Sequence, residues 1–350
     1  MLVPALFAAS EIKARSAQAG PAIDVLLFTD VAALTDAERQ WMAERDIRLH
    51  GEIDTGGWKD FVRDARLSAS SLVRLVLTRR LADRYDKLLY IDADISVHAP
   101  VDALLRLDTG EAPIAAASAG HLFINAGARE RAESHFRALG MSTPYRFFNS
   151  GVMLIDVKKW NREDLGERAL AFIRRDPDLC FLPDEHALNA ILDGRFAALS
   201  PIWNARILAW RSPQVQAILD PVLIHYDGPN KPWKRFGKHR RLFEDRTGYR
   251  LYEDFVRESP WPTWLDDQWT LKDVLRNAGE ELKNLSRYMR GRSRIPTRRE
   301  YAGYIAAFAR YCREWPFADV AQGITIRQDG RLRLNTQKAT TGPDHAQRCE

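Results

Sequence analysis

Short, largely apolar runs recur along this chain, and each is followed by a small polar or charged residue. Such runs occupy residues 23–28, 88–91, 114–117, 152–155 and 222–224 and are typical of strands buried in a sheet. Residues 47–53 predict a further strand, and apolar residues at helical spacing predict helices over residues 34–42, 68–85 and 100–107 and after Asp184. This alternation predicts an α/β fold in which helices cover both faces of a mostly parallel sheet.

The strand predicted at residues 88–91 runs directly into two carboxylates, Asp92 and Asp94. Because side chains alternate along a strand, both carboxylates are expected to project to one side, with Ala93 on the other. Two ionised groups so close repel each other and are costly to desolvate, so they need a shared cation or solvent. A hard divalent metal that also bridges to phosphate oxygens meets that need. An isolated Asp-Ala-Asp is also typical of the start of a turn and is weak evidence for a metal site by itself.

Two further segments place short polar side chains next to apolar runs. Asn149, Ser150 and Gly151 lie in a predicted turn before the strand at 152–155 and suit a pocket floor that backbone approaches closely, although a hairpin or bulge explains them as well. Asp184, Glu185 and His186 lie where a helix is predicted to begin, with Asp184 as its N-cap. The alternative is that these three only cap the helix and complement its dipole.

His225 ends the strand predicted at 222–224, in the same way that Asp92 follows an earlier strand. A lone histidine at a strand end is more often a packed, hydrogen-bonded residue than a metal ligand. Here Gly228 and Lys231 follow it, which adds a place for close backbone approach and a point charge for phosphate. The three together favour a metal-diphosphate site.

In this order and at these spacings, the motifs resemble those of glycosyltransferase family 8, the retaining enzymes that include bacterial lipooligosaccharide galactosyltransferases and glucosyltransferases, and glycogenin. The resemblance covers residues 2–264 and is carried jointly by four blocks, each of them weak alone. The blocks are the helix containing Arg74 followed by residues 86–94, and residues 148–152, 183–189 and 225–233. The resemblance implies a GT-A fold, an α/β nucleotide-binding domain with a mixed sheet and helices on both faces, followed by a mostly helical extension.

The resemblance also implies the ligands of the donor. It places a metal, Mn²⁺ or Mg²⁺, between Asp92, Asp94 and His225 and against the diphosphate of a UDP-sugar. Lys231 and the backbone near Gly228 would hold that diphosphate.

The donor-sugar pocket implied by the resemblance is lined by Arg74, Asn149 and Asp184. Glu185 follows, at a position where relatives commonly carry glutamine. A carboxylate there serves as a nucleophile, or stabilises an oxocarbenium ion, better than an amide does. The resemblance therefore makes Glu185, Asp184 and Asn149 the predicted catalytic residues.

Two features depart from the family pattern. Relatives usually carry an aspartate shortly after the strand at 114–117, where this chain has Ser118-Ala119-Gly120, so a sugar contact is expected to be missing or supplied from elsewhere. Family members also begin with a central strand that contacts uridine, and this chain starts at Met1 inside the helix that follows that strand. We hypothesise that the start codon lies upstream; an in-frame stop codon directly before Met1 would contradict this.

The composition is that of a globular protein, since 45% of the 350 residues are hydrophobic, enough for a sizeable core. Its three cysteines are scattered without pairing, which argues against a disulfide framework or a zinc site and favours a reducing compartment, by default the cytoplasm. Residues 1–9 are apolar but lack the positive n-region of a signal peptide, so a buried helix is expected. No apolar run reaches the roughly 18 residues of a membrane-spanning helix.

Charge divides the chain into two parts. The net charge is +5, and residues 266–350 carry 16 Lys and Arg against 11 Asp and Glu, so the whole excess lies there. We predict a catalytic domain over residues 1–265 and a basic extension over 266–350, ending in a small hairpin at 324–334. Six arginines and no acid lie between Ser286 and Arg299, which predicts peripheral contact of residues 266–300 with an anionic membrane. The alternative is a solvated helix on the catalytic domain, and no nucleic-acid partner is expected without a recognised module.

The sequence therefore predicts a metal-dependent retaining hexosyltransferase that moves glucose or galactose from a UDP-sugar to a glycan or lipopolysaccharide-type acceptor. It is expected in the cytoplasm, or on the inner face of the cell membrane. One alternative is a sugar nucleotidyltransferase, but the Gly-rich phosphate loop it needs near the N-terminus is not visible. The other is a degenerate nucleotide-sugar binder without turnover, which a missing first strand would favour.

Overall fold

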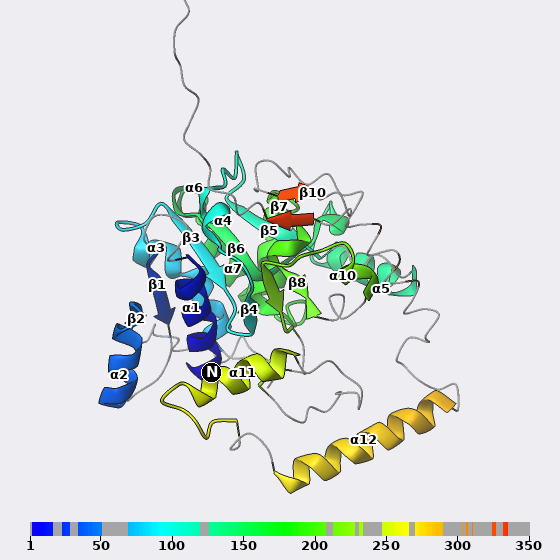
Figure 1. Ribbon diagram of the computed structural model, residues 1–350. Helices are drawn as coiled ribbons and strands as arrows, with labels where there is room; N and C mark the ends of the chain where they lie inside the picture. The colour runs from blue at the N-terminus through cyan, green and yellow to red at the C-terminus, as the bar shows by residue number, and fades with distance from the viewer. Residues whose placement is uncertain are drawn as a thin grey trace, which may run out of the picture.

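The computed structural model describes residues 2–16, 23–28, 34–50, 69–119, 126–207, 213–227, 231–233, 247–265, 270–289, 324–326 and 332–334, and the single residues 303, 306 and 310. Figure 1 shows the strands grouped at the centre with helices around them. The helices are α1 (Leu2–Ser16), α2 (Asp36–Ala43), η2 (Ala69–Leu75), α3 (Leu77–Leu81), α4 (Asp102–Arg106), α5 (Ala126–Ala138), η4 (Pro144–Arg146), α6 (Val157–Arg162), α7 (Leu165–Arg175), α8 (Pro183–Leu192), η5 (Pro201–Trp203), α10 (Pro213–Gln216), α11 (Thr247–Arg257) and α12 (Leu271–Met289).

The strands of the described residues form two larger sheets and two pairs. One sheet has the order β3-β6-β5-β7 and another the order β4-β9-β8, while β1 pairs with β2 and β10 with β11. The bounds are β1 (Val25–Phe28), β2 (Ile47–His50), β3 (Lys87–Ile91), β4 (Ile95–Val97), β5 (Ile114–Ser118), β6 (Phe148–Asp156), β7 (Ala197–Leu199), β8 (Ala205–Arg206), β9 (Leu223–His225), β10 (Ile324–Ile326) and β11 (Leu332–Leu334).

Strand direction differs from the sequence-based prediction of a mostly parallel sheet. Strand β6 is antiparallel to both β3 and β5, and β4 is antiparallel to β9. Parallel pairing joins β1 to β2, β5 to β7 and β8 to β9. The prediction of a mostly parallel sheet is wrong because an apolar run reports burial on both faces and carries no information on direction. The resulting mixed sheet agrees with the fold class that the family resemblance implied.

Strand β6 lies at the centre of the core, and its residues from Phe148 to Ile155 are buried. Since side chains alternate along a strand, Val152 and Leu154 join one apolar cluster, while Met153 and Ile155 join another. The first cluster includes residues of α4, η5 and α10, and the second includes residues of α7 and α8. Helices therefore cover both faces of the sheet, as predicted.

Three local predictions need correction. The residues that were expected to form a turn before β6 belong to the strand itself, which begins at Phe148. The helix expected over residues 68–85 is a 3-10 helix, η2, followed by the short helix α3. Asp184 does not cap α8, because Pro183 already occupies the first helical position and the side chain of Asp184 bonds to Ser150.

Strand β3 was expected to be buried on both faces, and all of its residues are only partly buried. It lies at the end of its sheet, and within the described part of the chain no strand pairs with its second edge. An edge strand keeps part of its surface accessible, which explains the difference.

Helices α1, α2 and α11 form a further apolar region beside β1. Residues 2–9, predicted as a buried helix, open α1, whose Phe7 packs against Phe255 of α11 with ring centroids 5.2 Å apart. Trp41 of α2 meets the same Phe255 edge-on at 5.7 Å. A capping box of Thr35 and Glu38 begins α2.

Helix α12 belongs to the extension and carries exposed apolar side chains. Leu271, Leu275, Leu282 and Met289 are 64–73% exposed and recur at helical spacing. No helix among the described residues is long and apolar enough to cross a membrane. The hairpin of β10 and β11 confirms the one predicted at residues 324–334.

Candidate active site

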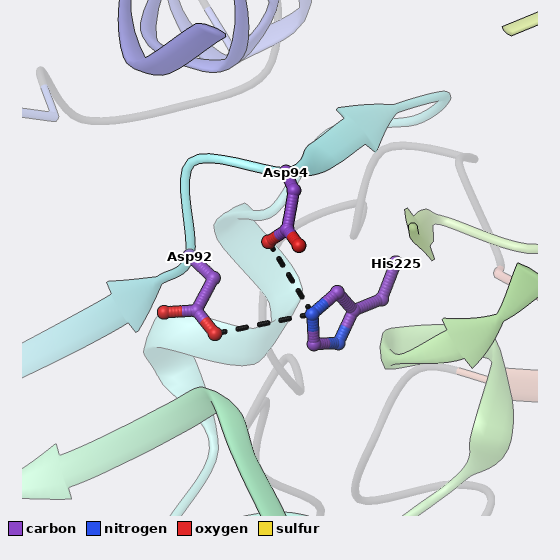
Figure 2. A group of neighbouring side chains, drawn as sticks. All are labelled: Asp92, Asp94 and His225. Carbon is purple, nitrogen blue, oxygen red and sulfur yellow. Dashed lines mark ion pairs between the residues drawn. The ribbon is translucent and has the colours of Figure 1, made fainter. Parts of the chain in front are cut away.

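The three predicted metal ligands converge where strands end. Asp92 follows β3, Asp94 precedes β4 and His225 ends β9, and Figure 2 shows their side chains pointing toward one another. The Nε2 atom of His225 lies 3.4 Å from Asp94 Oδ1 and 3.9 Å from Asp92 Oδ2. One ligand atom from each residue lies within 4.8 Å of the others. Two carboxylates and one imidazole are a donor set that suits a divalent cation such as Mn²⁺.

Gly151 makes this convergence possible. The N–H of Asp92 donates to the carbonyl of Gly151 at 2.9 Å, which brings β6 alongside the end of β3. A Cβ atom at residue 151 would lie 2.3 Å from Cε1 of His225 and 2.8 Å from Oδ2 of Asp92. Only glycine fits at residue 151, so His225 and Asp92 approach each other over its backbone.

Arg74 ties the metal ligands to the neighbouring pocket. Its guanidinium is buried and donates to Asp92 Oδ1 at 2.8 Å and to the carbonyl of Ser150 at 2.8 Å. The same group lies 3.1 Å from Oδ2 of Asp184 and stacks on the ring of Tyr90. The Tyr90 hydroxyl also donates to Asp92 Oδ1 at 2.7 Å. Both donors occupy one oxygen of Asp92, so its other oxygen is left to face His225.

A chain of hydrogen bonds runs from Glu185 to His225. Glu185 Oε2 accepts from Asn149 Nδ2 at 2.7 Å and from the backbone N–H of Ser150 at 3.0 Å. Asn204 Nδ2 donates to Asn149 Oδ1 at 2.8 Å, and Nδ1 of His225 lies 3.0 Å from Asn204 Oδ1. This arrangement places a proton on Nδ1, which donates to Asn204, and makes Nε2 the ring nitrogen that faces the two aspartates.

The buried carboxylates of α8 hold protons more tightly than usual. Burial raises the pKa of Glu185 to about 7, with a smaller contribution from Asp184, against the opposing effects of Arg206 and the Ser150 N–H. Burial also raises the pKa of Asp184, even though Arg74 acts against it. Near neutral pH, Glu185 is therefore divided between its protonated and ionised forms.

Lys231 forms an ion pair with Oδ2 of Asp94 and donates to the carbonyl of Tyr226 at 3.1 Å. Burial by itself would raise the pKa of Asp94, but His225 and Lys231 outweigh it and hold the pKa well below its usual range. An ammonium group thus lies beside the metal ligands, where a phosphate oxygen bound to the metal would come within its reach. Gly228, which was predicted beside it, lies outside the described residues.

The structure brings together all the predicted site residues that it describes: Arg74, Asp92, Asp94, Asn149, Asp184, Glu185, His225 and Lys231. It adds Tyr90 and Asn204, to which the sequence assigned no role, and it places Ser150, which was predicted only for a pocket floor, between Arg74 and Glu185. Ser150 and Tyr90 lie inside the recognised motifs, so their position in the motifs was an available signal. The sequence signal for Asn204 was weaker, because it is a single amide side chain that follows the largely apolar residues 201–203.

His186, the third of the polar residues predicted at the start of α8, faces away from this network. Its Nδ1 lies 3.0 Å from the carbonyl of Leu179, and its ring meets Phe181 edge-on. Burial, with His135 nearby, lowers the pKa of His186 to about 4. It is a neutral, packed histidine at neutral pH.

Sheets with helices on both faces and an Asp-x-Asp turn beside a histidine define a GT-A-type domain. The model of glycosyl transferase family 8 matches residues 25–237, more than half of the chain, and the chain belongs to this family. The predicted family and its enzyme class, a family 8-like hexosyltransferase, are therefore confirmed.

Individual relatives agree with this assignment. General stress protein A of Bacillus subtilis is 29% identical over 202 residues, which cover 54% of this chain and 67% of that protein. The lipopolysaccharide 1,2-glucosyltransferase of Escherichia coli is 27% identical over 205 residues, which cover 55% of this chain and 56% of that enzyme. The chain thus spans about half to two thirds of the length of these relatives.

Among solved structures, galactosyltransferase LgtC in complex with donor and acceptor sugar analogues matches with a TM-score of 0.57. The match covers 74% of this chain and 92% of that chain at 22% sequence identity. At this identity the likeness bears on fold alone, and it confirms the predicted GT-A fold class.

Proposed function

We propose that this protein is a metal-dependent retaining glycosyltransferase that moves glucose or galactose from a UDP-sugar to a glycan or lipopolysaccharide-type acceptor. The observation that carries the proposal is the convergence of Asp92, Asp94 and His225 beside the buried side chains of Arg74, Asp184 and Glu185 in a family 8 chain. The relative from E. coli is named for glucosyl transfer to lipopolysaccharide, and LgtC was solved with donor and acceptor sugar analogues. Family membership also favours transfer over the nucleotidyltransferase alternative.

The side chains of this cluster suit a divalent cation. Asp92 and Asp94 offer oxygens and His225 its Nε2 nitrogen, and Lys231 is the cation paired with Asp94. Mn²⁺ or Mg²⁺ bound there would offset the charge that develops on UDP as it leaves. Lys231 then binds the diphosphate as a point charge, together with the backbone near Gly228.

The donor sugar is proposed to occupy the pocket beside Arg74. Arg74 holds Asp184 and Asp92 in fixed positions, so each carboxylate presents one oxygen in a defined direction. Carboxylate oxygens accept hydrogen bonds from sugar hydroxyls, and an amide such as that of Asn149 can both donate and accept, so a few such groups give specificity. Hydroxyl orientation at these groups decides between glucose and galactose.

Glu185 is proposed to act at the anomeric carbon. As a nucleophile, its carboxylate forms a bond to that carbon while the bond to the UDP oxygen breaks. The acceptor oxygen then displaces Glu185 and loses its proton, so two inversions give retention. In the alternative route the acceptor attacks from the face of the leaving group, and ionised Glu185 stabilises the oxocarbenium ion. Both routes need the ionised carboxylate.

The proposal is tested by hydrolysis of UDP-sugars without an acceptor. UDP-glucose, UDP-galactose and UDP-N-acetylglucosamine are incubated with the protein and Mn²⁺ or Mg²⁺, and released UDP is measured. We expect release from UDP-glucose or UDP-galactose that EDTA suppresses, because the metal offsets charge on the leaving group. Binding of a UDP-sugar without release under any condition would instead identify a nucleotide-sugar binder.

The extension is proposed to hold the enzyme at an anionic membrane surface, where a lipid-linked acceptor would lie. Helix α12 exposes Leu271, Leu275 and Leu282 along one side, and the arginine-rich residues 287–299 follow it in sequence. Apolar contact together with several basic residues, each contributing about 1 kcal/mol near anionic lipid, is enough for peripheral binding.

Replacement of Leu271, Leu275 and Leu282 by serine in the full chain is expected to abolish flotation with vesicles that contain phosphatidylglycerol. The wild-type chain should float with these vesicles, and less so with pure phosphatidylcholine or at high salt, because salt screens the charge. Equal flotation of the two chains would contradict the proposal and favour a helix with no membrane role. A matched control is serine at Lys272, on the same helix, which should lower flotation only slightly.

A further inference from the structure

A cavity of about 850 Å³ lies between α1, α2 and α11, and none of the metal ligands lines it. Its walls come from the second half of α1, the end of α2 with the residues after it, and the last turns of α11. Sites for small molecules usually measure about 300–1,000 Å³, so the cavity is large enough for an organic ligand.

An aromatic layer separates this cavity from the metal site. Phe7 lines the cavity, and its ring packs on Tyr252 with centroids 4.1 Å apart. Tyr252 is fully buried and does not line the cavity, and its pKa is raised by burial and then by nearby Asp94. The cavity and the metal site therefore lie on different sides of the pair formed by Phe7 and Tyr252.

Part of the cavity wall is aromatic. Phe7, Trp41 and Phe255 contribute to it, and Phe255 meets each of the other two rings edge-on. Edge-to-face packing fixes the orientation of these rings before any ligand arrives. Phe7 is 2% and Trp41 8% exposed, and the guanidinium of Arg45 lies over the Trp41 ring, so the partly buried ring of Phe255 is the aromatic surface most open to a ligand.

Much of the remaining lining is charged, and carboxylates are in excess among the charged side chains. Five of the lining side chains are carboxylates and two are basic, so a free phosphate would be repelled. Salt bridges offset these charges: Lys13 with Asp46 at 2.5 Å, Arg15 with Glu11 at 2.6 Å, Arg45 with Glu44 at 3.7 Å and Arg257 with Asp254 at 3.5 Å. Carboxylates that accept hydrogen bonds from hydroxyl groups, in a lining that disfavours anions, suit a neutral ligand that has many hydroxyl groups.

We infer that this cavity is a second saccharide-binding site, which holds a neutral part of the glycan acceptor away from the transfer site. A pyranose has C–H groups on one face and hydroxyls around its edge, so it matches the ring of Phe255 with carboxylates beside it. A lipid chain would leave the charged groups desolvated, and a nucleotide would bring phosphate to carboxylates. The assignment of the ligand as acceptor rests on the proposed function, whereas the binding of saccharide does not.

The test fills the cavity with a larger side chain. Ala14 is an exposed residue of α1 that lines the cavity, and Ala43 is an exposed residue of α2 that does not. Both Ala14→Trp and Ala43→Trp are expected to fold, which circular dichroism checks. Calorimetry and saturation-transfer NMR then measure binding of neutral di- to hexasaccharides built from glucose, galactose and N-acetylglucosamine.

We expect at least one of these saccharides to bind the wild-type chain and Ala43→Trp, and Ala14→Trp to weaken that binding by about tenfold or more. Ala14→Trp should leave metal-dependent hydrolysis of the UDP-sugar unchanged, and Asp94→Ala should leave saccharide binding unchanged. Failure of the proposed function would thus appear in hydrolysis alone. The inference is overturned if no saccharide of the panel binds, if both tryptophan variants bind equally, or if the cavity takes only a cationic peptide such as tetra-arginine.

Discussion

Replacement of Asp94 by alanine is expected to lower Mn²⁺-dependent hydrolysis of UDP-hexose by about 10³-fold or more, because one of three metal ligands is lost. Asp94 also pairs with Lys231, so the variant frees the ammonium group from its position beside the metal ligands. Activity and Mn²⁺ affinity should fall together, the first measured by UDP release and the second by electron paramagnetic resonance. Loss of activity with unchanged Mn²⁺ affinity would contradict the ligand assignment.

Asp86 provides a matched control for this variant. It precedes the same strand, β3, but its side chain is 79% exposed and pairs on the surface with Lys158. Exposed ion pairs contribute little to stability, so Asp86→Ala should keep both hydrolysis and Mn²⁺ affinity within about twofold of the wild type. A similar loss in both variants would mean that the strand, and not the metal site, is disturbed.

Glu185→Gln is expected to lower the rate of hexose transfer by about 100-fold at pH 8, because an amide cannot replace the ionised carboxylate at the anomeric carbon. In the wild type, burial raises the pKa of Glu185 to about 7. The rate should therefore rise with pH through about 7, and the variant should lose this limb of the profile. A pH profile that is unchanged in Glu185→Gln would exclude a role for the ionised form.

Glu185→Gln is also expected to increase the stability of the protein at pH 8, the pH at which it lowers the transfer rate. A carboxylate whose pKa is raised in the folded state favours folding at low pH, and this contribution is lost as pH rises from about 4.5 toward 7. Ionised Glu185 thus costs stability at pH 8, by about 3 kcal/mol at most, and Glu185→Gln removes that cost. We expect the variant to unfold at a higher temperature than the wild type at pH 8, with little difference at pH 4.5.

Mass spectrometry distinguishes the two routes open to Glu185. With UDP-hexose and no acceptor, a nucleophilic Glu185 should accumulate as a glycosyl ester on the peptide that contains it. Transfer from the face of the leaving group produces no such adduct. The hydrogen bonds from Asn149 and Ser150 both reach Oε2, so Oε1 is the atom expected to attack.

The motifs allowed the site residues to be chosen before their positions were known. Asp92, Asp94 and His225 each end or follow an apolar run, and the structure places all three within one cluster. From the sequence, the segment from Asp92 to Asp94 allowed two interpretations, a turn or a metal site. It is a turn between β3 and β4 that also brings both carboxylates to His225, so the two interpretations describe the same feature.

Other features of the site could not be predicted from the sequence. Asn204 is 21 residues from His225, and only the parallel pairing of β8 with β9 sets its oxygen 3.0 Å from Nδ1. The raised pKa of Glu185 depends on burial by parts of the chain far from α8. The half-buried state of β3 follows from its place at a sheet edge, which an apolar run cannot indicate.

The sequence by itself determined which side chains can do the chemistry, because residue type and the position of polar groups at the ends of apolar runs are local properties. It also determined where most strands lie, since burial imposes the apolar runs. Only the tertiary structure decided strand direction, the approach of Asp92 and His225 across Gly151, and the cavity between α1, α2 and α11. These features depend on contacts between residues far apart in the chain, and the free energy of such contacts cannot be inferred from the sequence of any single segment.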